Sequence, residues 1–202
     1  MRFSIIVASF SLLALAPASA QVFEAGGYGG VLRYSSRAIG TIGAAVPGDP
    51  PTSIQFKDSW MFGLRMTLNP WTHFGHEFGY AYHRSPIQFG TSSNAEVQGT
   101  AIHNGNYSFL AYATSEGSRV RPFAAGGGNF SNFIVPGGSV TSGGGQTKIG
   151  FHFGGGVKVI VHRMFLIRFD ARQYMSGKPF DLRDQSGLLR RNEISAGLSF
   201  FM

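Results

Sequence analysis

Three charged side chains stand at alternate positions in the segment FLIRFDARQY, residues 165–174: Arg168, Asp170 and Arg172. Side chains two residues apart on a β-strand lie on the same face. One face of this segment would therefore carry Arg, Asp and Arg, while the other carries mostly aromatic and aliphatic groups. Guanidinium and carboxylate groups at this spacing form ion pairs and hydrogen bonds, and burying them without partners costs free energy. The segment predicts a strand with one apolar face and one charged face.

A possible nucleophile is found in the tripeptide His83-Arg84-Ser85. On a strand the imidazole and the hydroxyl would share a face, so the histidine could act as a base toward the serine. Pro86 follows directly, however, and the nearest loop carboxylate, Glu96, has no assigned place beside the pair. We therefore predict no catalytic residue and no enzyme activity.

Metal and cofactor sites are not expected. The chain has no cysteine, and His73 and His76 would lie on opposite faces of a strand. The glycine-rich segment 137–145 lacks the strand-to-helix context of a phosphate-binding loop. The formal net charge of +7 is spread without a basic run, which argues against nucleic acid as a partner.

Alternation of apolar and polar residues recurs along the chain and predicts eight strands. Their ranges are 22–34, 60–68, 72–83, 100–114, 119–130, 147–159, 164–174 and 192–202. Glycines leave the facing of 22–34, 100–114 and 119–130 open, although Glu24 and Tyr28 are expected on one face. The chain contains 19 Phe and 29 Gly, which also favours β-structure.

The connections between these segments alternate in length. Short ones are 69–72, 115–119 and 161–163, and long ones are 35–58, 84–98, 131–146 and 175–191. Tight turns on one side of a membrane and longer loops on the other produce this alternation. Trp60 and Trp71 bracket one strand and are expected at the two interfaces, with Tyr80, Tyr82, Tyr112 and Tyr174 at the outer rim. We predict an all-β, eight-stranded antiparallel up-and-down transmembrane β-barrel, since an open sheet edge in hydrocarbon would leave backbone groups unpaired.

The first twenty residues have the pattern of a signal peptide. Arg2 provides the positive charge, residues 5–15 the apolar stretch, and Ala18-Ser19-Ala20 the small-residue cleavage site. We therefore expect a cleaved segment at 1–20 and a barrel domain at 21–202.

The C-terminal strand carries the residues that identify a family. Ser195, Gly197 and Phe200 match the spacing of the signal that the barrel-assembly machinery reads, and Met202 stands where a terminal Phe is usual. With RPFAAGGG (121–128) and IRFDARQY (167–174), the chain resembles the bacterial outer-membrane β-barrel family, in particular small eight-stranded barrels similar to the transmembrane domain of OmpA. The resemblance implies a monomer in the bacterial outer membrane, with both termini periplasmic. It implies outer-membrane lipid, lipopolysaccharide and the assembly machinery as partners.

Alternation predicts a set of polar residues that face the inside of such a barrel. Glu193 is expected to pair with Arg168 or Arg172, and Arg190 and Arg191 are expected as a solvated pair near the outer rim. Two interpretations of the lumen stay open: a structural polar plug, and a small low-conductance pore opened when ion pairs exchange partners. Adhesion or ligand binding by the surface loops is a further alternative. The resemblance also implies a less favoured one, hydrolysis of lipid A acyl chains by the His83 and Ser85 pair. The predicted inward residues are Arg65, Glu77, Lys148, His152, Lys158, Arg168, Asp170, Arg172 and Glu193.

Overall fold

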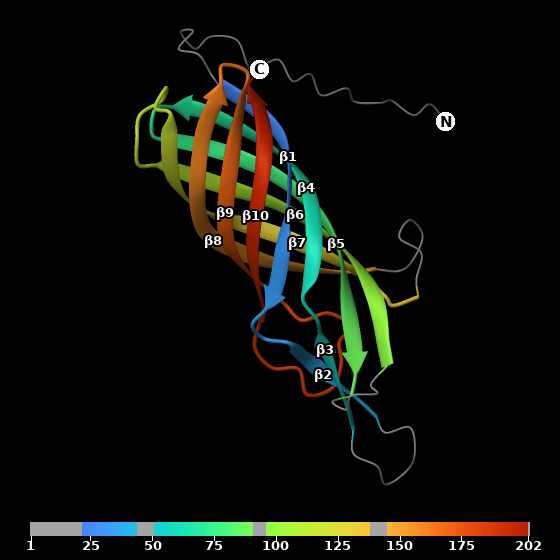
Figure 1. Cartoon of the computed structure of the whole chain (residues 1–202). Helices are drawn as coiled ribbons and strands as arrows, with labels where there is room; N and C mark the ends of the chain where they lie inside the picture. The colour runs from blue at the N-terminus through green and yellow to red at the C-terminus, as the bar shows by residue number, and fades with distance from the viewer. Residues whose placement is uncertain (1–21, 44–50, 91–95, 138–144, 202) are drawn as a thin grey trace, which may run out of the picture.

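The computed structural model describes residues 22–43, 51–90, 96–137 and 145–201, and within them it forms a closed antiparallel barrel (Figure 1). Each of the eight long strands pairs with the next, β1 pairs with β10, and the β5–β6 pairing completes the closure. The predicted fold class is thus confirmed. The barrel strands are β1 (Val22–Tyr34), β4 (Ser59–Trp71), β5 (Phe74–Phe89), β6 (Glu96–Tyr112), β7 (Val120–Ile134), β8 (Gly145–His162), β9 (Phe165–Ser176) and β10 (Leu189–Phe201).

The two ends of the barrel differ. The end that we call the near end holds both ends of the described chain and the short turns after β4, β6 and β8. The opposite end, called the far end, holds the described connection between β9 and β10 and the two remaining strands, β2 (Ala38–Ile42) and β3 (Thr52–Phe56). The predicted signal peptide with Ala18 and Ala20, and the C-terminal Met202, lie outside the described residues.

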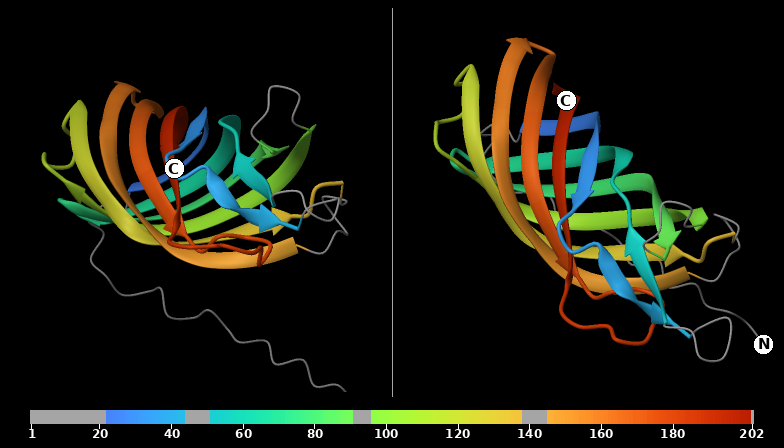
Figure 2. Two further views of the ribbon diagram at one scale, coloured as in Figure 1. Left: turned by 90° about the horizontal axis from the view of Figure 1, so that it is seen from below. Right: turned by 60° about the horizontal axis from the view of Figure 1, so that its bottom comes forward.

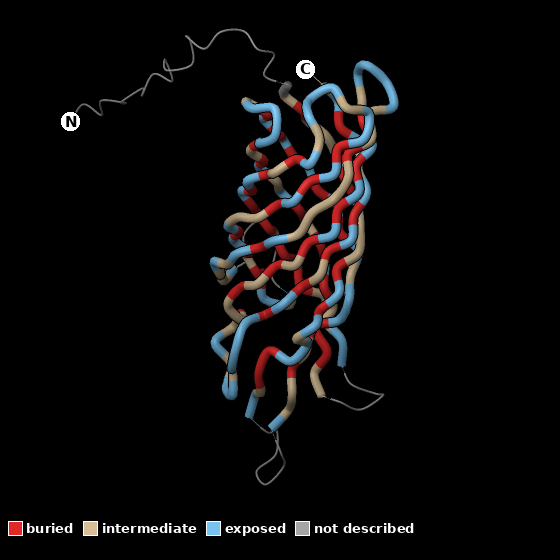
Figure 3. Tube along the Cα trace, turned by 90° about the vertical axis from the view of Figure 1, so that its left-hand side faces the viewer, coloured by how far each residue is buried: buried red, intermediate tan, exposed pale blue. Residues whose placement is uncertain are grey.

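Burial alternates along the strands, as the changing colours of Figure 3 show. On β4 the outward Trp60 is 79% exposed, whereas the inward Arg65 is 5% exposed. Large apolar side chains cover the outside, where a lipid bilayer is the matching medium. The three strands whose facing was open are now assigned, since their inward sets are buried. These sets are Glu24, Tyr28 and Leu32 on β1; Asn104, Asn106, Ser108, Leu110 and Tyr112 on β6; and Arg121, Phe123, Asn129, Ser131 and Phe133 on β7.

Close packing of strands inside the barrel depends on glycine beside Tyr28. The register places Tyr28 opposite Gly63 of β4 and opposite Gly197 of β10. A Cβ on Gly63 would lie 2.7 Å from the Tyr28 ring, and one on Gly197 would lie 2.8 Å from the Tyr28 Cβ. The absence of a side chain at both glycines therefore provides the space that the inward Tyr28 occupies.

The segment 35–58 was expected to be a loop, but its described residues include β2 and β3, which pair with each other as an antiparallel hairpin. β3 then adds to the far part of β5, with Ile54 opposite Phe89 and Phe56 opposite Ile87. The neighbouring segment 84–98 was also expected as a loop, and most of it lies in β5 and β6. β5 and β6 extend into this segment because they pair with each other along their whole length. The pairing begins with Phe74 opposite Ala111 and ends with Phe89 opposite Glu96.

Two tyrosines assigned to the outer rim face inward instead. Tyr112 is 5% exposed and lies at the near end of β6, and Tyr174 is 2% exposed on β9. Tyr112 shares the face of the buried Leu110, and Tyr174 shares that of Arg172, so strand alternation overrides the tendency of tyrosine to lie at interfaces. Tyr80, by contrast, points outward and is 45% exposed.

Candidate functional site: the polar interior of the barrel

The middle of the lumen holds a group of ion pairs that we call the central network: Arg65, Glu77, Arg168, Asp170 and Arg172. Arg168 donates to Asp170 through Nε at 2.9 Å and Nη2 at 2.8 Å, and it also pairs with Glu77. Arg172 Nη2 lies 2.6 Å from a Glu77 oxygen and 3.0 Å from an Asp170 oxygen. Arg65 Nη1 reaches Asp170 at 2.6 Å. All five side chains are nearly or fully buried. The ion pairs show that each of the two carboxylates is shared between guanidinium groups.

Aromatic rings hold two of these guanidinium groups in place. Arg65 stacks on Tyr28, with its Cζ 3.7 Å from the ring centroid. Arg168 lies over the Phe123 ring at 4.3 Å. Cation–π contacts of this kind gain strength where water is excluded. The glycines beside Tyr28 therefore contribute indirectly to the position of Arg65.

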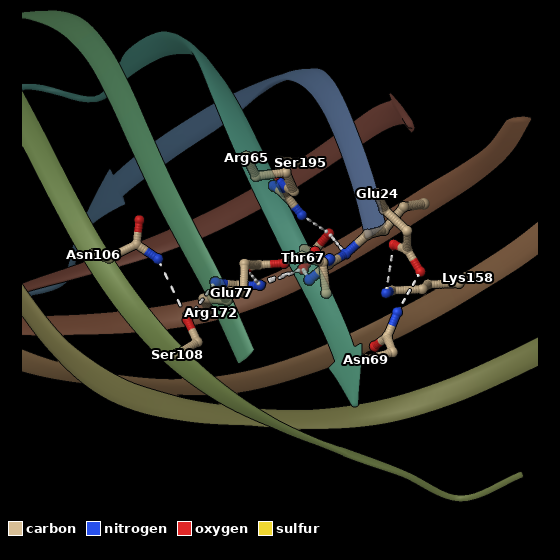
Figure 4. A network of polar contacts seen from close by, with 12 residues as sticks. Glu24, Arg65, Thr67, Asn69, Glu77, Asn106, Ser108, Lys158, Arg172 and Ser195 are labelled. Atoms are coloured by element: carbon tan, nitrogen blue, oxygen red, sulfur yellow. Dashed lines mark hydrogen bonds and ion pairs between the residues drawn. The ribbon is translucent and has the colours of Figure 1, made fainter. Parts of the chain in front are cut away.

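A second group, the near-end cluster, consists of Glu24, Asn69, Tyr112 and Lys158. Lys158 Nζ donates to Glu24 at 2.7 Å and to the Tyr112 hydroxyl at 2.7 Å. Asn69 donates to the other Glu24 oxygen at 2.9 Å and accepts from Tyr112 at 2.7 Å. Figure 4 shows Glu24, Asn69 and Lys158 side by side and apart from Glu77 and Arg172. The lumen is thus crossed by polar contacts at two levels.

At the far end the lumen meets an apolar cluster that we call the far-end seal. It consists of Tyr34, Ile39, Ile54, Phe56, Ile87, Ile102, Phe133 and Leu189. Phe56 of β3 is fully buried and stacks on Tyr34 with centroids 4.9 Å apart. Phe180 and Leu182, from the connection between β9 and β10, pack against the same cluster. The β2–β3 hairpin and this connection therefore close the barrel mouth together.

Backbone hydrogen bonds tie the two parts of the far-end seal to each other. Thr41 and Arg183 exchange a pair of them at 2.9 and 3.2 Å, and the Thr41 hydroxyl donates to Asp184 at 2.6 Å. Figure 2 shows β2 beside the long connection that joins β9 to β10. At the rim Lys148 Nζ lies 2.9 Å from Asp181, and this hydrogen bond holds the pKa of Asp181 below its usual range.

Most of the predicted inward residues lie in the central network or the near-end cluster. The contacts of Glu193 and the location of Arg191 differ from the expectation. Glu193 accepts from Ser195 at 2.8 Å, whereas the arginines expected to pair with it contact Glu77 and Asp170. Arg191 was expected in solvent near the rim, yet it is 1% exposed and lies inside the barrel. There its Nη2 donates to Ser131 at 2.8 Å. Arg191 and Glu193 are two residues apart on β10 and therefore share a face. Alternation alone was thus sufficient to predict that Arg191 faces the lumen.

The remaining predicted positions have simpler surroundings. His152 lies inside, with its Nε2 2.8 Å from the Ser108 hydroxyl, and Lys148 lies at the far mouth. On β10, Ser195 faces inward, Gly197 borders Tyr28, and Phe200 points outward and is 49% exposed.

His83 and Ser85 do meet, with Nδ1 3.0 Å from Oγ. Both side chains face the lumen and are at most 1% exposed, under the far-end seal. The serine hydroxyl also contacts Tyr34 and Ser59, each at 2.9 Å, and Arg191 lies 3.4 Å from the other imidazole nitrogen. The pair therefore lies inside the barrel and not on its outward apolar surface.

The alternation pattern left the facing of Glu24 open, and it did not indicate Asn69 or Arg121 as lumen residues. The partner of Lys158 on β8 is Glu24 on β1, which is three strands away around the barrel. Alternation within one strand cannot indicate such a partner. Among the described residues no group of three or more His, Cys, Asp or Glu side chains could hold a metal ion. No helix in the described ranges is long and apolar enough to cross a membrane.

The fold and the polar interior define the class of small membrane β-barrels. The family model of the outer membrane protein beta-barrel domain matches residues 5–200, so the chain belongs to this family. No protein in the curated set matches it.

Several solved structures share the fold. OprG from Pseudomonas aeruginosa aligns with a TM-score of 0.58 at 12% identity, covering 91% of this chain and 96% of that one. Neisserial surface protein A aligns at 0.56 with 12% identity, covering 89% and 96%. The N-terminal β-barrel domain of OprF from P. aeruginosa aligns at 0.53 with 12% identity, covering 90% and 98%. At such identities the similarity extends to the fold alone.

Proposed function

We propose that this outer-membrane barrel has a structural and surface role, and that its lumen is a polar plug rather than an open pore. The observation that carries the proposal is the central network, in which every carboxylate is shared between guanidinium groups and every charged side chain is buried. Such charges are expensive to separate, because each would lose its partner inside a narrow, poorly hydrated space. The far-end seal adds an apolar barrier at one mouth.

Solute uptake by liposomes tests this proposal. Liposomes that contain the folded chain should swell in small uncharged solutes no faster than empty liposomes. Swelling well above that background, with folding verified on the same sample, would contradict a plugged lumen.

A small gated pore is the second candidate, and one observation favours it. Arg172 Nη2 contacts Glu77 and Asp170 at once, so its guanidinium could exchange carboxylates without leaving the network. The buried charged residues of the described lumen are six cations and four anions, which would favour anions in any opened state. Currents that appear only at raised voltage and prefer chloride over potassium would support the gate.

The sidedness follows the same proposal: the near end faces the periplasm and the far end faces the outside. Tight turns gather at the near end, as they do on the periplasmic side of outer-membrane barrels. Lipopolysaccharide is then the lipid around the far half, and the barrel-assembly machinery is the partner that reads Ser195, Gly197, Phe200 and Met202.

A further inference from the structure

A pocket of about 650 Å³ opens at the far end, beyond the far-end seal. Ile54 and Ile87 of the seal line it, and so do Phe180 and Leu182 from the connection between β9 and β10. Its volume lies within the range of small-molecule sites, and its walls are mostly apolar, as in such sites. The far-end seal therefore lies between the pocket and the charged lumen. Ile54 and Ile87 of the seal form the apolar floor of the pocket.

The backbone at Phe180 is unusual for a residue of this size. Its φ of 71° lies in the left-handed region, as do the φ angles of Asp181 and Asp184 in the same connection. A bulky non-glycine residue adopts this conformation at a cost in free energy, which other contacts must offset. In this case the strained residue places its ring against Phe133 and in the pocket wall.

The polar groups around the pocket indicate which ligands fit. No charged side chain of the described residues lines it, and the two polar side chains in its wall are Gln98 and Gln146. Gln146 is occupied, since it donates to Asp181 and accepts from the Phe180 amide. Gln98 donates to Glu96 at 2.6 Å, and its carbonyl oxygen is left to accept a hydrogen bond.

The nearby charges act against an anionic ligand. Lys148 is already paired with Asp181 at 2.9 Å, and Glu96 adds a second carboxylate beside Gln98. A ligand carboxylate would lose its hydration in this apolar space and would find no cationic side chain among the described residues that line the pocket. A neutral hydroxyl or N–H group would instead find the Gln98 oxygen.

We propose that this far-end pocket binds small, uncharged, predominantly apolar molecules that carry a hydrogen-bond donor. This is a binding activity beyond the structural role, and it does not require the lumen to conduct. The pocket contributes apolar contact from the far-end seal, and Gln98 selects the donor group.

A matched pair of probes tests the inference. Binding of 2-naphthol and 2-naphthoate at neutral pH is measured by calorimetry, with the whole folded chain in phospholipid nanodiscs and empty nanodiscs as the background. We expect saturable binding of the neutral naphthol and binding of the anionic naphthoate at least about tenfold weaker. Absence of saturable naphthol binding, or equal binding of naphthoate, would overturn the proposal.

Variants localise the site. Ile42→Asp places a carboxylate on the pocket rim, outside the far-end seal, and should weaken naphthol binding at least about tenfold. Val161→Asp is the matched control, because Val161 is comparably exposed but lies at the near end. Gln98→Leu should weaken naphthol several-fold and leave naphthalene unchanged. Equal losses of naphthol binding for Ile42→Asp and Val161→Asp would place the probe outside the far-end pocket and overturn the inference. A barrel that does not conduct and binds no naphthol would overturn the binding inference but not the proposed plugged lumen.

Discussion

At the scale of single residues, the molecule depends on charges that are buried together. Arg168 bonds both carboxylates of the central network and also lies over the Phe123 ring. Removing one member of a buried ion pair leaves the other charge without compensation, which is more costly than losing the pair. Substituting one member of the central network is therefore expected to destabilise the barrel more than substituting both members of an ion pair.

Arg168→Ala should lower the free energy of unfolding by about 3–5 kcal/mol, because Glu77 and Asp170 lose a shared cation. Urea unfolding of the refolded barrel in detergent measures the change. Arg37→Ala is the matched control, since Arg37 pairs with Asp58 on the surface with side chains 51% and 40% exposed. That exposed pair should contribute about 1 kcal/mol or less. Similar losses in the two variants would show that burial of the network is not what makes it costly to break.

At the scale of elements, β10 combines two roles that its sequence pattern does not separate. Gly197 matches the assembly signal, but the structure also shows it packed against Tyr28. Phe200 matches the same signal and points outward, with half of its side chain exposed. The two positions should therefore behave differently when no assembly machinery is present.

Gly197→Ala should lower the yield and stability of the barrel refolded in detergent, because the added Cβ would lie 2.7 Å from the Gly27 carbonyl oxygen. Phe200→Ala should refold nearly as the unmodified chain does, yet assemble less well in cells. The yield of folded barrel in detergent and in cell envelopes is compared for both variants. Normal refolding of Gly197→Ala would remove the packing role.

The β2–β3 hairpin makes a prediction of its own. Phe56→Ala should cost about 3–5 kcal/mol of unfolding free energy, because a fully buried ring that stacks on Tyr34 is lost. Hydrogen exchange should then rise at β2, β3 and the connection after β9, while the near-end cluster stays protected. Val97→Ala, which removes an exposed side chain at the same end, is the control. Protection that remains unchanged at the far end would mean that Phe56 does not hold the seal.

The elements also show how far sequence reasoning reaches. Alternation in 165–174 was sufficient to predict the facing of Arg168, Asp170 and Arg172, since a strand fixes side-chain direction at every second residue. The β2–β3 hairpin was not predicted, because its stability comes from β5 and the connection after β9, both distant in sequence. Partners across the barrel, such as Glu24 for Lys158, depend on the closure register, which no single strand encodes.

At the scale of the whole molecule, the two ends of the barrel are chemically distinct. The near end has an ion-pair cluster and short turns, and the far end has an apolar seal with a pocket beyond it. The proposed sidedness follows from these differences. It is open to a direct test because the chain contains no cysteine of its own.

Lys57→Cys at the far end and Glu116→Cys at the near end each introduce one exposed thiol. On intact cells a membrane-impermeant maleimide should label Lys57→Cys and leave Glu116→Cys unlabelled until the envelope is opened. The reverse pattern would invert the assignment of the two ends.

The central claim is that the lumen is closed by its own side chains, and ion conductance across a planar bilayer tests it most directly. The refolded chain, with folding shown by a mobility difference between unheated and boiled samples, should give no discrete current steps at low voltage. Arg168→Ala and Glu193→Ala are recorded beside it to relate any current to the lumen charges. Regular steps from the unmodified chain, altered in size or frequency by these two changes, would contradict a plugged barrel and make the central network part of a pore.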